Sequence, residues 1–281
     1  MIDEITLLNA AQLNVRAALS EDLGNEKDVS AALIPTDVAA RAQVISRDAG
    51  IFCGRVWVEE TAKQVDSNIL IDWCKEDGER ISANDVLFYL TGSAPALLTA
   101  ERTMLNFVQL LSGTATKTAA YVGLIAATEC TLLDTRKTIP GLRVAQKYAV
   151  TCGGGANHRQ GLYDAYLLKE NHIAAAGSIS AAVQNARQAN PHLTLEVEVE
   201  SLAELEEAIA AGADIAMVDN FTLEQTRTAV TMARGNIKLE ASGGIDEKSI
   251  TDIAATGVDY ISIGELTKNI DPLDLSMRFV D

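Results

Sequence analysis

The segment from Leu132 to His172 carries most of the residues that could bind a charged ligand. Acidic residues outnumber basic ones 39 to 23 in the whole chain, giving a net charge of −16, but this segment has six cations against three acidic residues. The cations are interleaved with glycine, proline and apolar residues, unlike the bunched charges of a solvated basic surface. A local excess of positive charge in an acidic protein indicates an anionic ligand. The six cations are Arg136, Lys137, Arg143, Lys147, Arg159 and Lys169.

A glycine run, Gly153–Gly155, comes shortly before His158 in the same segment. Glycine lets the backbone approach a ligand closely, so His158 is expected to be a donor that faces the ligand. We expect His172 to be a structural cap and His192 to be a surface residue. The spacing of these histidines does not fit a zinc site.

The composition excludes several classes of protein. A chain of 281 residues with 48% hydrophobic residues forms one large or two smaller domains with a sizeable core. It contains no apolar run of the ~18 residues that a membrane span needs, and its N-terminus lacks the basic start of a signal peptide. We therefore expect a cytoplasmic protein. The acidic balance disfavours nucleic acid as a partner. Four widely spaced cysteines are expected to be reduced thiols: Cys53, Cys74, Cys130 and Cys152.

Residues 1–112 predict an N-terminal α+β sandwich domain. A helix is predicted over 7–19 and another over 99–111, whose candidate apolar stripe includes Leu105, Val108 and Leu111. Three strands are expected at 40–46, 69–74 and 86–91. The candidate apolar positions of the first helix are Leu8, Ala11, Leu13, Val15 and Leu19.

Residues 113–267 predict an α/β barrel, because short apolar strands alternate there with amphipathic helices such as 202–211 and 223–233. About six to seven strands favour an incomplete TIM-like barrel, and the tail 268–281 is expected to pack on the N-terminal domain. The expected strands are 131–136, 165–169, 193–199, 215–219, 237–242 and 259–264.

Each expected strand ends in a polar residue or a glycine. Because catalytic groups of such barrels lie at the carboxyl ends of the strands, these residues should surround one mouth. They are Arg136, Lys169, Glu198, Asp219, Ser242 and Gly264.

The loops after the last two strands indicate a phosphate site, the place where barrels of this kind often bind phosphate. Ser242, Gly243, Gly244 and Gly264 would form it. The alternative is that these glycines only form tight turns with positive φ.

Glu196, Glu198 and Glu200 share one face of their strand by its period of two. Carboxylates inside a barrel are costly unless they are paired or bound to metal. Glu198 and Asp219 could hold Mg²⁺ together with substrate phosphates, or stabilise a developing sugar cation. An ion pair of these carboxylates with Lys137 or Lys169 is the compatible alternative.

Lys169 allows a different chemistry. A lysine that ends an apolar strand could form a Schiff base if burial lowered its pKa, which would make the protein an aldolase. The other cations nearby favour charge matching to a strongly anionic substrate instead.

Several segments together resemble quinolinate phosphoribosyltransferase, from about residue 16 to the C-terminus. They are ERTMLNFVQLLSGTAT, DTRKTIPGLRVAQKYAV, GGGANHRQGLYDAYLLKENH, EVEVES, VDNF, LEASGGI and VDYISIGELTK. The run from DTRKT through GGG and NHR to LLKENH is the specific part. The segment EDLGNEKDVS departs from the family's EDLGxGDxT pattern in the loop 25–30.

The resemblance implies transfer of phosphoribose from phosphoribosyl pyrophosphate to quinolinate with decarboxylation. The products would be nicotinate mononucleotide, pyrophosphate and CO₂, a step of de novo NAD biosynthesis. It also implies Mg²⁺ and a homodimer with a shared active site, to which the neighbouring subunit contributes Arg102.

The resemblance assigns three groups of residues. The catalytic group is Lys137, Glu198 and Asp219, and the last two are also the residues assigned to metal. The quinolinate-binding group is Arg102, Arg136, His158, Arg159 and Lys169. The phosphate-binding group is Ser242, Gly243, Gly244 and Gly264.

Two further alternatives stay open at this point. A paralogous phosphoribosyltransferase-like protein, such as the molybdenum-transport-associated relatives, or a nicotinate-using enzyme would not release CO₂ from quinolinate. A phosphate-sensing barrel would bind its ligand without consuming it.

Overall fold

The structure is a computed structural model that describes residues 2–24 and 26–280, and it divides into two compact units. The first unit comprises Met1–Ala119, Thr138–Gly154 and Glu265–Asp281. The second comprises Ala120–Lys137 and Gly155–Gly264. The division differs from the expected boundaries mainly because the segment 138–154 groups with the first unit. Of the loop 25–30, Asn25 lies outside the described residues.

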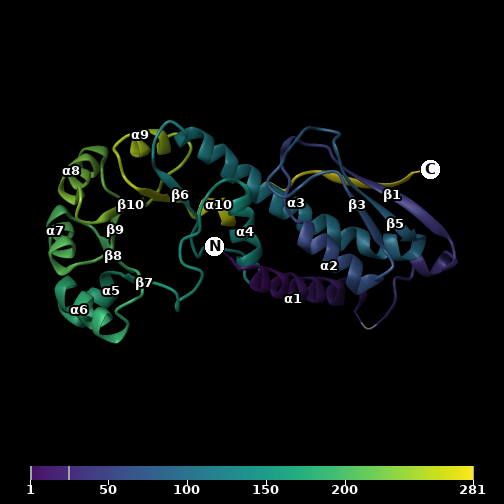
Figure 1. Ribbon diagram of the computed structural model, residues 1–281, viewed down its shortest axis with the longest axis horizontal. Coiled ribbons are helices and arrows are strands. Elements are labelled where there is room, and N and C mark those ends of the chain that lie inside the picture. The colour runs from purple at the N-terminus through teal and green to yellow at the C-terminus, as the bar shows by residue number, and fades with distance from the viewer. Residues whose placement is uncertain (1, 25, 281) are drawn as a thin grey trace. The chain divides into compact units, whose positions relative to one another are not determined.

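A four-stranded antiparallel sheet forms the centre of the first unit, in the order β12-β1-β5-β3 (Figure 1). The C-terminal segment supplies the edge strand β12, which pairs with β1 from Arg41↔Val280 to Ser46↔Leu275. The strands are β1 (Ala39–Ser46), β3 (Leu70–Trp73), β5 (Val86–Ser93) and β12 (Leu275–Val280), beside the small pair β2 (Gly50–Ile51) and β4 (Arg80–Ile81).

Helices complete the first unit's two hydrophobic clusters. The first cluster packs residues of β1, β5, α2 and α3, and includes the predicted Leu105 and Val108. The second packs α1 against α2, α3 and α4, and includes Leu111. The helices are α1 (Glu4–Leu23), η1 (Ala31–Leu33, 3₁₀), α2 (Arg55–Val65), α3 (Ala94–Ile125, which runs on into the second unit), α4 (Arg143–Cys152) and α10 (Glu265–Lys268).

Helix α1 buries a narrower face than the sequence predicted. It begins at the cap Asp3, whose carboxylate accepts the Thr6 N–H at 2.8 Å. Its buried residues follow an i, i+4 spacing. They are Leu7, Ala11, Val15 and Leu19. The assignment of Leu8 and Leu13 to the apolar face was wrong, since these side chains are 50% and 62% exposed.

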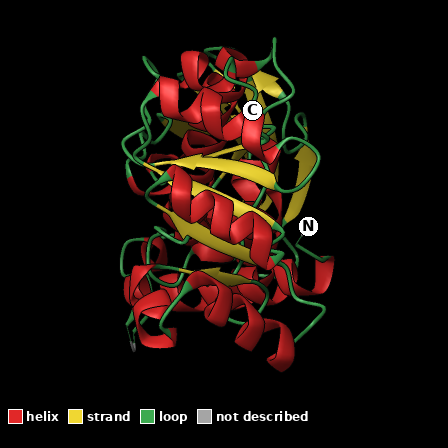
Figure 2. Ribbon diagram, turned by 90° about the vertical axis from the view of Figure 1, so that its left-hand side faces the viewer, coloured by secondary structure: helices red, strands yellow, loops and turns green. Residues whose placement is uncertain are grey.

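A six-stranded parallel sheet forms the second unit, in the order β6-β11-β10-β9-β8-β7. The sheet curves inside an arc of helices on the left of Figure 1. Seen from that left-hand side, helices lie in front of the strands (Figure 2). Within the described residues β6 and β7 are its two edges, so the barrel is incomplete, as predicted. The strands are β6 (Thr131–Leu133), β7 (Tyr166–Leu168), β8 (Leu195–Val199), β9 (Ile215–Asp219), β10 (Lys238–Ser242) and β11 (Tyr260–Ser262).

Local capping signals define the helices between these strands. Ser201 accepts the Glu204 N–H at the start of α7, and Thr222 forms a capping box with Gln225 at the start of α8. These two helices have the predicted bounds. The helices of this unit are α5 (Glu170–Ala176), α6 (Ile179–Ala189), α7 (Leu202–Ala211), α8 (Leu223–Ala233) and α9 (Ile250–Ala254).

Two negative findings apply to the described part of the chain. It contains no helix with the length and hydrophobicity needed to cross a membrane. Its four cysteines are free thiols.

Candidate active site

The parallel sheet brings the predicted residues of the second unit to the carboxyl ends of its strands. Glu198 and Asp219 lie within the last two residues of β8 and β9, and Ser242 ends β10. Lys169 directly follows β7, and Gly264 lies two residues beyond β11. Arg136 and Lys137 come after β6, which ends at Leu133 and is shorter than the predicted strand 131–136.

Arg102 belongs to the first unit, whereas the group described above belongs to the second. It is an exposed residue of α3 in the part assigned to the first unit. All other residues predicted for the site belong to the second unit.

Lys169 and Glu198 form an ion pair between the neighbouring strands β7 and β8. The Glu198 side chain is 11% exposed and the Lys169 side chain 42% exposed. An ammonium group held by a carboxylate lacks the lone pair that a Schiff-base nucleophile requires. The contact therefore favours charge matching at Lys169 over the aldolase alternative.

The ends of β9 and β10 form a tight joint. Asp219 and Ser242 are register partners, and the Asn220 N–H donates to the Ser242 carbonyl at 3.1 Å. The Asn220 side chain donates to Asp219 Oδ2 at 2.7 Å. A Cβ atom on Gly243 would lie 2.3 Å from Asn220 Oδ1, and Gly243 has φ +97°. Glycine is therefore required at position 243 by the geometry of the turn. This requirement is compatible both with a turn alone and with a phosphate site.

Gly264 leaves room for the side chain of Lys137. A Cβ atom at this position would lie 2.7 Å from Lys137 Cδ and 3.3 Å from Thr135 Oγ1. The residue after β11 thus shapes the space through which the lysine after β6 extends.

The positive charges of Arg136 and Arg159 act on each other. Burial lowers the pKa of Arg159, and the positive charge of Arg136 lowers it further. The Arg159 Nη1 group donates to the Ala165 carbonyl at 3.4 Å. Two guanidinium groups that repel each other form a site where an anion with more than one negative charge is favoured.

His158 forms a buried cluster with two glutamates. Its Nε2 lies 2.8 Å from Glu196 Oε2 and 3.4 Å from Glu240 Oε2. Glu196 is 2% exposed and Glu240 is 0% exposed. The sequence placed Glu196 on the same strand face as Glu198, but it missed Glu240, whose only signal is a carboxylate inside the apolar strand β10.

The cluster retains a proton near neutral pH. Burial raises the pKa of Glu196 to about 7, against the opposing effect of the His158 hydrogen bond. Burial lowers the pKa of His158, but the hydrogen bonds and charges of Glu196 and Glu240 outweigh it and raise this pKa to about 10. Because His158 Nδ1 accepts the Arg159 N–H, the extra proton of this group is held at the His158 Nε2–Glu196 contact and not on Nδ1.

The hydrogen bonds of the ring decide where its own proton lies. The Arg159 N–H donates to His158 Nδ1 at 2.8 Å, so Nδ1 is the acceptor and Nε2 carries the hydrogen. A protonated Nε2 cannot bind a metal ion. Although the ligand atoms of His158, Glu196 and Glu240 lie within 4.8 Å of one another, the group therefore fits a hydrogen-bonded cluster better than a metal site.

The other two histidines have the predicted roles. His172 accepts the Lys169 N–H on its Nδ1 at 3.1 Å and so caps α5, and His192 is exposed.

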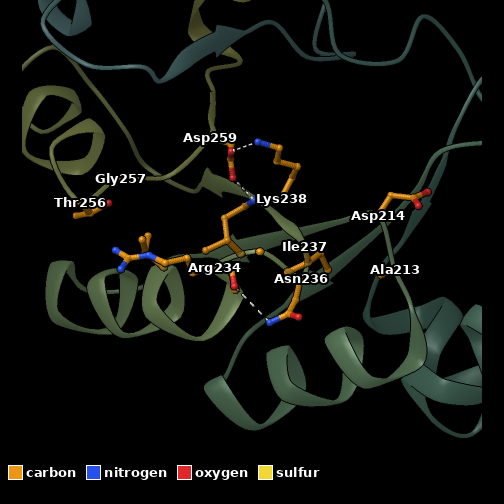
Figure 3. A pocket seen from close by; sticks show the side chains of 13 residues that line it. Ala213, Asp214, Arg234, Asn236, Ile237, Lys238, Thr256, Gly257 and Asp259 are labelled. Carbon is orange, nitrogen blue, oxygen red and sulfur yellow. Dashed lines mark hydrogen bonds and ion pairs between the residues drawn. The ribbon is translucent and has the colours of Figure 1, made fainter.

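A pocket lies at the opposite ends of the strands (Figure 3). It is lined by residues next to the amino ends of β9, β10 and β11, including Asp214, Lys238 and Asp259. Lys238 Nζ lies 2.5 Å from Asp259 Oδ1, and Asp259 Oδ2 accepts the Leu239 N–H. Lys238 and Asp259 are thus paired with each other, and Asp214 pairs with Arg187. In barrels this end contributes to stability rather than to chemistry.

Comparisons with known proteins agree with this geometry. Residues 28–112 match the N-terminal domain and residues 114–278 the C-terminal domain of quinolinate phosphoribosyl transferase. A probable nicotinate-nucleotide pyrophosphorylase [carboxylating] of Bacillus subtilis is 44% identical, over 92% of this chain and 89% of the relative.

Solved structures show the same likeness. The nicotinate-nucleotide pyrophosphorylase from Francisella tularensis superposes with a TM-score of 0.94 at 50% identity and covers 97% of both chains. NadC from Streptococcus pyogenes superposes with a TM-score of 0.91 at 42% identity, over 95% of this chain and 96% of that one. The chain belongs to the quinolinate phosphoribosyl transferase family.

Proposed function

We propose that the chain transfers phosphoribose from phosphoribosyl pyrophosphate to the ring nitrogen of quinolinate and releases CO₂. The products are nicotinate mononucleotide, pyrophosphate and CO₂, in de novo NAD biosynthesis. The observation that carries the proposal is the set of charged residues at the carboxyl ends of one parallel sheet, where Lys169 pairs with Glu198 and the charges of Arg136 and Arg159 act on each other. The names of the relatives, nicotinate-nucleotide pyrophosphorylase [carboxylating], support the same reaction.

Quinolinate carries two carboxylates on adjacent ring carbons and therefore suits a site with several cations. The planar forks of Arg136 and Arg159 bind carboxylates in two-point contacts, and Lys169 adds a compact charge. His158 lies beside them, with both ring nitrogens already bound within the protein.

The ring nitrogen attacks the anomeric carbon of the ribose as the bond to pyrophosphate breaks. The ribose passes through a state with oxocarbenium character, in which positive charge develops on the sugar. Glu198 and Asp219 stabilise that charge, and Lys137 stabilises the leaving pyrophosphate. Backbone groups at Ser242, Gly243, Gly244 and Gly264 hold the sugar phosphate.

Decarboxylation follows from the new charge on the ring. Once its nitrogen is alkylated, the pyridinium withdraws electrons from the adjacent carbon that bears a carboxylate. The bond to that carboxylate breaks, CO₂ leaves, and the electron pair stays on the ring carbon until a proton arrives. The protein mainly has to orient this carboxylate and keep it from water.

Mg²⁺ fits the carboxylates at the mouth. One oxygen of Glu198 is held by Lys169 and one oxygen of Asp219 by Asn220, while the other oxygen of each has no hydrogen bond within the described residues. Glu198 and Asp219 would hold the ion together with oxygens of the pyrophosphate, the ligand set that Mg²⁺ prefers. Bound there, the ion would neutralise phosphate charge.

We further propose that the enzyme is a homodimer and that Arg102 of one subunit completes the site of the other. The exposed position of Arg102 on α3 is compatible with this role. Mixing an Arg102→Ala protein with a Lys169→Ala protein should restore part of the activity, because a mixed dimer has one intact site. No recovery after proven subunit exchange would contradict the shared site.

The direct test is to incubate the protein with quinolinate, phosphoribosyl pyrophosphate and Mg²⁺ and to follow nicotinate mononucleotide. Equal amounts of CO₂ and mononucleotide are expected. Nicotinate in place of quinolinate separates the paralogous alternative, because its turnover releases no CO₂. Binding of phosphoribosyl pyrophosphate without product would support the sensing alternative and contradict the proposal.

A further inference from the structure

Glu196 is a buried carboxylate without a role in the proposed reaction. It projects from β8 and is 2% exposed, and its Oε1 has no hydrogen-bond partner in the described part of the chain. Burying a carboxylate costs several kcal/mol unless its contacts offset that cost. Its Oε2 lies 2.8 Å from His158 Nε2.

His158 connects this carboxylate to Arg159. Its Nε2–H donates to Glu196, and its Nδ1 accepts the backbone N–H of Arg159. The His158 imidazole thus bridges strand β8 and the backbone of Arg159, the next residue in the chain.

The segment before Arg159 is held from a second direction. Asp134, which is 0% exposed, accepts the Asn157 side chain at 2.6 Å and the His158 N–H at 2.9 Å. Asp134 fixes the backbone on the β6 side, and Glu196 fixes the ring on the β8 side. Together they leave the Arg159 backbone little freedom.

We propose that Glu196 is a positioning residue that acts through His158 to fix Arg159. The substrate part of this inference rests on the proposed function. The hydrogen-bonded chain from Glu196 to Arg159 does not, so it can be tested in the protein without substrates.

The first test uses the ligand-free protein. Hydrogen exchange of the Arg159 amide should be about tenfold faster in Glu196→Leu than in the wild type, the effect expected from the net loss of one hydrogen bond. The Glu204 amide, which donates to Ser201 Oγ, is the internal control and should not change. Nitrogen NMR of the histidine rings should show the hydrogen of His158 on Nε2 in the wild type.

Glu240→Leu is the matched variant. It removes an equally buried carboxylate that lies farther from the ring, with Oε2 3.4 Å from His158 Nε2 against 2.8 Å for Glu196, so Arg159 should stay protected. Glu196→Gln retains an acceptor for Nε2–H and should restore most of the protection if Glu196→Leu loses it. Equal exchange in all four proteins, or a hydrogen on Nδ1 of His158, would overturn the inference.

The second test measures substrate binding. Glu196→Leu should raise the KM for quinolinate about tenfold and change the KM for phosphoribosyl pyrophosphate less than twofold. In a His158→Ala background the same substitution should add nothing, because the bridge is already gone. An equal rise in both KM values, or a fully additive effect, would show a merely structural role. If the wild type does not turn over quinolinate, the proposed function fails, and the exchange experiment still decides the inference.

Discussion

Gly264→Ala should impair catalysis because it displaces Lys137. The added methyl carbon would lie 2.7 Å from Lys137 Cδ, whereas two such carbons prefer about 3.5–4.0 Å. The lysine side chain must therefore move by about 1 Å, and a displacement of that size costs on the order of 10²-fold in rate when it affects a catalytic group. Gly264 has no positive φ, so the backbone itself accepts alanine.

The assay is steady-state formation of nicotinate mononucleotide, with thermal unfolding recorded for each protein. The effect on kcat/KM should be about 10²-fold, while the free energy of unfolding falls by only about 1 kcal/mol, because the exposed lysine can move aside. Gly123→Ala is the matched control: a Cβ there meets no atom within 4 Å, and its position in α3 favours alanine.

A double variant tests the cause. If the methyl group acts by moving Lys137, Gly264→Ala should add almost nothing to Lys137→Ala, because the displaced group is already missing. Wild-type turnover in Gly264→Ala, or a full 10²-fold effect in the Lys137→Ala background, would refute this reasoning.

Three further outcomes are expected. Glu198→Gln removes the negative partner of Lys169 and should reduce turnover at least about 10²-fold with unchanged circular dichroism; wild-type turnover would reject its role. The pKa of Asp28 is lowered by the backbone N–H of Ala31, so this carboxylate stabilises the fold above its ordinary pKa and loses the effect as the pH falls. Asp28→Ala should therefore lower the free energy of unfolding, measured in urea, by at most about 1 kcal/mol at pH 7 and by less at pH 3. An equal loss at both pH values would contradict a stabilising role of the ionised carboxylate. Asp259→Asn weakens the contact with Lys238 in the pocket of Figure 3 and should lower the unfolding temperature slightly while kcat and KM stay within twofold; a larger kinetic effect would give this end of the barrel a functional role.

Local signals allowed some elements to be predicted closely. The bounds of α7 and α8 agree with the predicted 202–211 and 223–233, because a serine or threonine cap starts each helix. Strand β9 has the predicted bounds 215–219, an apolar run that ends in Asp219. The parallel sheet then places the strand-end residues on one side without any further information.

Other features depend on contacts that the sequence does not contain. Leu8 and Leu13 have the same apolar character as Leu7, and only the packing of α1 against its neighbours decides which side is buried. The contact of His158 with Glu240 joins residues that are far apart in the chain, and strand β9 lies between the strands β8 and β10 that carry the two glutamates. The alternation along a strand predicts its inward face but not its partners across the barrel.

The measurement that tests the central claim most directly is a crystal structure of the protein with quinolinate. The two carboxylates should contact Arg136, Arg159 and Lys169 at the carboxyl ends of the parallel strands. Quinolinate bound instead at the amino ends, beside Lys238 and Asp259, or contacting none of the three cations, would contradict the claim.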